Sequence, residues 1–98
     1  MYRWETDGNN RFRIRTGRER LVILFGKDSL TVEIYDSAAE KPRSRVLIEE
    51  DGTTVNTSPQ RGRMGYYDVL DHRKEMLEAE GLGAAEKQSL ERYLRMLD

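Results

Sequence analysis

The feature that most constrains the fold is a regular alternation of apolar and polar residues between positions 11 and 35. Successive side chains of a β-strand point to opposite faces, so a one-residue slip in pairing moves every side chain to the wrong face. Pairing Phe25 with Leu30 places the apolar residues of two strands on one face. A two-residue turn upstream pairs Ile14 with Leu21 and places the preceding strand's apolar residues on that same face. The agreement of the two turns predicts an antiparallel meander.

The first hairpin has two alternative registers. A two-residue Gly8-Asn9 loop sets Trp4 opposite Arg13, whereas a three-residue loop over 8–10 sets Trp4 opposite Ile14. Burial of a large apolar side chain is worth about 1.5–3 kcal/mol, more than the roughly 0.5–1 kcal/mol of an exposed cation–π contact. We therefore prefer the three-residue loop, which also pairs opposite charges across the strands.

Two further strands are expected at 45–50 and 53–57. They flank Asp51-Gly52, a dipeptide typical of tight hairpins. Pairing Ile48 with Val55 turns both side chains inward. Residues 1–58 are thus expected to form five or six strands.

The apolar spacing becomes helical at Tyr66. One helix is expected to end at Gly81 with a Schellman cap, and a second to begin near Ala84, so that two helices occupy 66–97. The predicted fold is α+β: a single domain, 1–98, with an antiparallel β-meander of five or six strands packed on a C-terminal helical hairpin.

Composition excludes several classes of protein. The chain has no cysteine and a formal net charge of −1, with 36% charged residues. These values predict neither a disulfide framework nor a thiolate site, and they give no overall attraction to duplex nucleic acid or anionic membranes. No apolar run resembles a signal peptide or a membrane span. We expect a small cytoplasmic protein with no membrane contact and no cofactor.

The outer face of the meander is the main candidate site. Alternating arginines on one strand project together, away from the buried apolar residues between them. Arginine beside aliphatic and aromatic side chains is typical of protein interfaces, and also of sheets that bind single-stranded nucleic acid. A solvated face whose arginines pair with nearby acids is the competing interpretation. The candidate partner-binding residues are Arg11, Arg13, Arg15, Arg20, Val22, Leu24 and Tyr35.

Two weaker candidates lie in the second half of the chain. His72 is the only histidine, and Asp68 and Glu75 share its face of an unbroken helix. The three side chains form a half-site for a metal or a carboxylate-oriented base, but they are expected to face water. The loop containing Arg61 and Arg63 precedes a helix N-terminus and is a weak candidate for anion binding.

We therefore expect a non-enzymatic protein that acts through protein–protein contact, as an inhibitor, immunity protein or adaptor does, with a homodimer as one form it could take. The first alternative is a protein that binds single-stranded nucleic acid with its arginine-rich sheet face. The second alternative, which we rank lowest, is a metal-dependent enzyme centred on His72.

Overall fold

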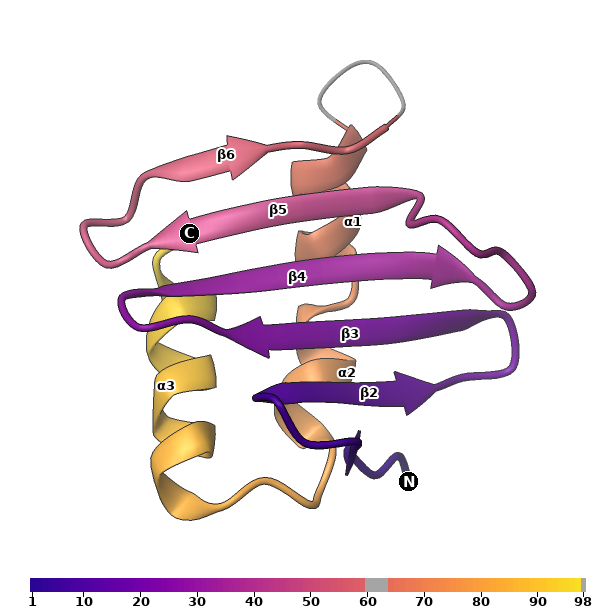
Figure 1. Ribbon diagram of the computed structural model, residues 1–98, viewed down its shortest axis with the longest axis horizontal. Coiled ribbons are helices and arrows are strands. Elements are labelled where there is room, and N and C mark those ends of the chain that lie inside the picture. Colours follow the sequence, from indigo (N-terminus) through magenta and orange to yellow (C-terminus); the bar gives the residue numbers. More distant parts are fainter. Residues whose placement is uncertain (60–63, 98) are drawn as a thin grey trace.

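The computed structural model describes residues 1–59 and 64–97. Six strands form one antiparallel sheet in which sequence order and spatial order coincide (Figure 1). The strands are β1 (Glu5–Thr6), β2 (Arg11–Arg15), β3 (Glu19–Phe25), β4 (Ser29–Asp36), β5 (Ser44–Glu49) and β6 (Thr54–Asn56). The helices are α1 (Met64–Asp71), α2 (Arg73–Glu78) and α3 (Ala84–Arg95).

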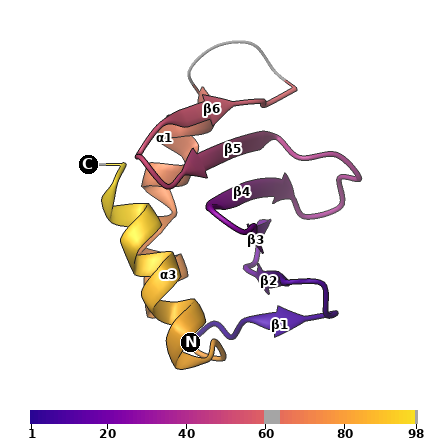
Figure 2. The ribbon, with the colours of Figure 1, turned by 60° about the vertical axis from the view of Figure 1, so that its left-hand side comes forward.

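All three helices lie on one side of the sheet, which gives the molecule two layers (Figure 2). The core fills the space between them and takes alternate residues from the central strands, as the predicted alternation requires. Among its fully buried members are Ile23, Val32 and Ile48 from the sheet and Leu90 and Leu94 from α3. The predicted α+β meander with C-terminal helices is confirmed.

The central register is the predicted one. Phe25 pairs with Leu30, and Ile14 pairs with Leu21. Glu5 pairs with Arg13, which is the register of the three-residue loop and leaves the preceding Trp4 only 3% exposed. Three consecutive residues of that loop, 8–10, have positive φ. Glycine and asparagine tolerate that conformation best.

The predicted inward position of Val55 is wrong. Val55 pairs with Leu47, Ile48 pairs with Thr54, and Val55 is 40% exposed. The reason lies in the turn. The amide of Glu49 donates to the carbonyl oxygen of Thr53 at 2.8 Å, so the loop holds three residues instead of two. One extra loop residue shifts the register by one and turns every later side chain to the other face.

The first predicted helix is interrupted at His72, which separates α1 from α2. It also ends before Gly81, because Ala79 is already extended. The chain here pairs with the N-terminal segment, where the amide of Trp4 donates to the carbonyl of Glu80 at 2.7 Å. Gly81 has φ +107°, and a Cβ at this position would lie 2.8 Å from the Trp4 carbonyl oxygen. Glycine is therefore needed for close approach to the N-terminal segment, not for the predicted Schellman cap.

Among the described residues, no helix combines the length and the apolar character needed to span a membrane.

Candidate functional site

The outer face of the sheet, on the side away from the helices, carries the predicted arginines. Phe12 and Ile14 are buried in the core. Their neighbours along β2 therefore point outward, and these are Arg11, Arg13 and Arg15. The strand registers extend this face across the sheet, since Arg13 lies opposite Val22, Val22 opposite Glu33, and Glu33 opposite Arg45.

Two of the predicted contact residues on this face are themselves covered. Val22 is 1% exposed and Tyr35 is 8% exposed, so these two candidate residues offer a partner almost no surface. The guanidinium carbon of Arg20 stands 4.5 Å from the centroid of the Tyr35 ring. Long arginine stems shield apolar neighbours in this way while keeping their charge near water.

A hydrogen bond fixes the Tyr35 ring beneath Arg20. The Tyr35 hydroxyl donates to Oε1 of Glu33 at 3.1 Å. Burial, followed by the adjacent Glu33 carboxylate, raises the pKa of Tyr35 above its ordinary value. The phenol therefore stays protonated and remains a donor to Glu33.

The competing interpretation, in which nearby acids neutralise the arginines, fails at two acids that pair elsewhere. Glu19 binds Arg43, with 2.5 Å between Oε2 and Nη2, and also binds His72. Glu33 accepts from Tyr35 and lies 3.7 Å from Arg45. Among the described residues, the contact of Asp7 with Arg11, at 3.9 Å, is the one ion pair between an acid and a predicted arginine of this face.

Arg13 and Arg15 consequently have no ion pair with any residue that the structure describes. The Nε atoms of Arg13 and Arg20 are also buried and find no acceptor in this part of the chain. Buried donors are normally satisfied. The outer face thus holds positive charge that the fold does not balance locally.

A row of aliphatic side chains crosses the same face. Leu24 lies opposite Thr31, Thr31 opposite Leu47, and Leu47 opposite Val55. Leu24 and Leu47 are half-buried and Val55 is exposed. The face therefore combines unpaired arginines with partly exposed aliphatic surface, as protein interfaces do.

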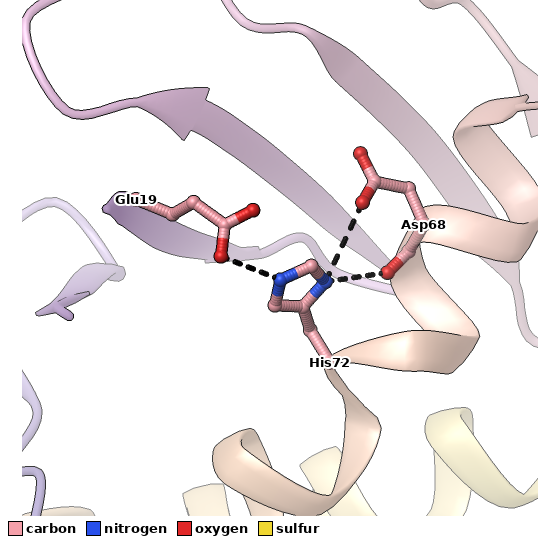
Figure 3. A group of neighbouring side chains, drawn as sticks. All are labelled: Glu19, Asp68 and His72. Carbon is pink, nitrogen blue, oxygen red and sulfur yellow. Dashed lines mark hydrogen bonds and ion pairs between the residues drawn. The ribbon is translucent and has the colours of Figure 1, made fainter. Parts of the chain in front are cut away.

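His72 occupies a different place from the one predicted. Its side chain is 12% exposed and lies between the sheet and the helices (Figure 3). Nε2 is 2.8 Å from Oε1 of Glu19, and Nδ1 is 2.7 Å from the backbone oxygen of Asp68. Since both ring nitrogens face oxygen acceptors, the doubly protonated imidazolium satisfies both contacts. The break between α1 and α2 places the ring here, and Glu75 does not join the cluster.

Arg43 joins the carboxylates of this cluster. It forms a two-point contact with Asp68, with 2.9 Å from Nε to Oδ2 and 2.9 Å from Nη2 to Oδ1. It also contacts Asp36 at 2.7 Å and Glu19 at 2.5 Å. Ser44 adds a hydrogen bond to Asp68 at 2.5 Å. This network ties the start of β3 and the start of β5 to α1.

The pKa values follow from these contacts. Burial opposes charge on His72, but its bonds to the Asp68 carbonyl and to Glu19 outweigh burial and raise its pKa above 6.5. Burial likewise opposes charge on Glu19 and Asp68. Hydrogen bonds from Arg43 prevail, helped by His72 at Glu19 and Ser44 at Asp68, and lower both carboxyl pKa values.

Glu19, Asp68 and His72 each bring one potential metal ligand atom within 4.8 Å of the others. Arg43 already contacts both Asp68 oxygens and the second Glu19 oxygen. A divalent ion would compete with a guanidinium for the same oxygens, so the geometry fits an ion-pair network better than a metal centre.

The sequence contained a signal for the burial of His72. His72 follows Val69 by three residues and precedes Met76 by four, and both of these are core residues. Helical spacing therefore places His72 beside the apolar stripe. Glu19 and Arg43 carry no such local signal, because they meet His72 and Asp68 only through tertiary structure. Arg61 and Arg63 lie outside the described residues.

No family model, curated protein or solved structure matches this chain.

Proposed function

We propose that this chain is a non-enzymatic binding protein whose outer sheet face attaches to an acidic surface of another protein. The observation that carries the proposal is the state of Arg13 and Arg15: both lie on one sheet face, and neither has an acidic partner among the described residues. An acidic partner surface would supply the missing carboxylates.

A protein partner fits this face better than single-stranded nucleic acid. Proteins that bind single strands stack bases on exposed aromatic rings. Tyr35, the aromatic residue of this face, is 8% exposed and lies beneath Arg20. The partly exposed Leu24 and Leu47, together with exposed Val55, supply apolar contact area for a protein instead.

Self-association through this face is disfavoured by charge. In a symmetric dimer the same patch appears on both subunits, so two faces with unbalanced positive charge would be brought together. We therefore propose a different protein as the partner.

Affinity capture from cells of the source organism tests the proposal. The tagged wild-type chain is compared with an Arg13→Gln/Arg15→Gln variant. Lys74→Gln is a control that removes one positive charge from another surface, because Lys74 is exposed on α2 in the opposite layer. We expect the wild type and the control to capture the same acidic protein and the double variant to lose it. Equal capture by all three would contradict the assignment of this face.

An oligonucleotide titration separates the two partner classes. If the face bound single strands, affinity would be measurable at low salt and would fall steeply as salt is raised. We expect no saturable binding of labelled single-stranded DNA or RNA. Saturable binding that the Arg13→Gln/Arg15→Gln variant abolishes would favour the nucleic-acid alternative over a protein partner.

A further inference from the structure

We propose that a hollow beside the β2–β3 turn is a binding site for one carboxylate group, contributed by an aspartate, a glutamate or the C-terminus of a protein partner. This inference rests on the proposed function and adds the chemical group that the face recognises. The hollow has a volume of about 420 Å³. Its lining residues are Arg15, Arg20, Ser37, Ala38, Ala39 and Glu40.

Arg20 is held in position before any ligand arrives. One of its terminal amino groups donates to the carbonyl oxygen of Ala39, and its guanidinium lies over the Tyr35 ring. Tyr35 is fixed in turn by its bond to Glu33. A guanidinium has five N–H donors in a planar fork that matches a carboxylate, so the one donated to Ala39 leaves others for a ligand.

Arg15 supplies the second guanidinium of the site. Its side chain is exposed and has no ion pair among the described residues. It lies directly opposite Arg20 in the β2–β3 register. Two guanidinium groups side by side repel one another, and an anion between them removes that repulsion.

The loop that forms the other wall is anchored at several points. The amide of Ser37 donates to the Arg18 carbonyl at 3.0 Å, and the amide of Ala39 donates to the Asp36 carbonyl at 3.0 Å. The Asp36 carboxylate is bound by Arg43 at 2.7 Å. A wall already ordered in the free protein reduces the entropy that binding must remove.

The charge of the lining selects the kind of anion. Two arginines and Glu40 give a net charge of +1, which a single carboxylate neutralises. A phosphate monoester carries a charge of about −1.5 to −2 at neutral pH. Glu40 is exposed and its negative charge in the lining repels an incoming anion, so its removal should strengthen binding.

Titration with sodium acetate, followed by NMR on the full chain at constant ionic strength, tests the site without the partner. We expect saturable shifts of the Ser37 and Ala38 amide signals and of the Arg20 side chain. Arg15→Gln should weaken acetate binding about tenfold, the cost of one charged hydrogen bond, and Glu40→Gln should tighten it. Arg92→Gln, on α3, is the control and should leave it unchanged. Retained native chemical shifts elsewhere show that each variant is folded.

Linear, unsaturated shifts, or saturation that Arg15→Gln leaves intact, would overturn the proposal. So would tight binding of inorganic phosphate with no saturable binding of acetate.

The outcomes separate this inference from the proposed function. Partner capture that depends on Arg13 but is insensitive to acetate and to Arg15→Gln would contradict the carboxylate site alone. Saturable acetate binding without capture of any acidic protein would contradict the proposed function alone.

Discussion

Nε2 of His72 lies 2.8 Å from Oε1 of Glu19, although the two residues are 53 positions apart in the chain. This contact links the first residue of β3 to the break between α1 and α2. It makes part of the fold's stability depend on the charge of one imidazole.

The stability of the fold should therefore have a maximum in mildly acidic solution. The raised pKa of His72 stabilises the folded state fully below its ordinary value of 6.5, and this contribution is lost as pH rises through the raised pKa. The lowered pKa of Glu19 stabilises the fold fully above its ordinary value of 4.5, and this contribution is lost as pH falls through the lowered pKa. We predict the largest free energy of unfolding between these two values.

Urea unfolding across a pH series checks this prediction in the wild type and in His72→Gln. The wild type should lose stability from pH 6.5 upward, whereas the variant should be nearly flat over that range and less stable by about 1–2 kcal/mol below it. Identical pH profiles for the two proteins would mean that His72 is not charged in the folded state.

Arg43 should contribute much more to stability than Arg45, two residues along. Arg43→Gln removes the guanidinium from Asp68, which is 12% exposed, and from Glu19, which is 20% exposed, and leaves His72 as the cation beside both carboxylates. The expected loss is about 2 kcal/mol, less than for a fully buried pair. Arg45→Gln removes only a 3.7 Å contact from a side chain that is 51% exposed and should cost less than about 1 kcal/mol. Equal losses, measured by urea unfolding, would contradict the role given to the Arg43 network.

Gly81 should be intolerant of a side chain. A Cβ there would lie 2.8 Å from the Trp4 carbonyl oxygen, and its φ of +107° is unfavourable for alanine. We predict that Gly81→Ala lowers the free energy of unfolding by more than about 1 kcal/mol. Gly17→Ala is the control, because nothing lies within 4 Å of its added Cβ, and it should change stability by no more than about 0.5 kcal/mol. The emission of Trp4, the only tryptophan, reports on both transitions.

The central sheet could be predicted because its turns agree with its alternation. Phe25 with Leu30 and Ile14 with Leu21 are local pairings, and a slip at either turn would expose a whole strand face. Val55 was misplaced because Asp51-Gly52 fits a two-residue and a three-residue loop equally well. A strand of three residues offers too little alternation to choose between them.

The polar network was beyond sequence analysis for a different reason. His72 follows Asp68 by four residues, directly after the end of α1, and their proximity was predicted. Glu19 and Arg43 reach them only after the sheet packs on the helices. No local sequence pattern around either residue predicts which side chain it contacts. The burial of Tyr35 beneath Arg20 was not predicted for a similar reason. The alternation predicts on which face of the sheet a side chain lies, but not which neighbouring side chain covers it.

The most direct test of the account is the dissociation constant of the captured partner, measured by titration calorimetry for the wild type, Arg13→Gln and Lys74→Gln. Removal of one charged hydrogen bond at an interface should weaken binding about tenfold or more. We predict that loss for Arg13→Gln, with an unchanged value for Lys74→Gln and weaker wild-type binding at high salt. An unchanged dissociation constant for Arg13→Gln in a folded protein would contradict the claim that this sheet face binds the partner.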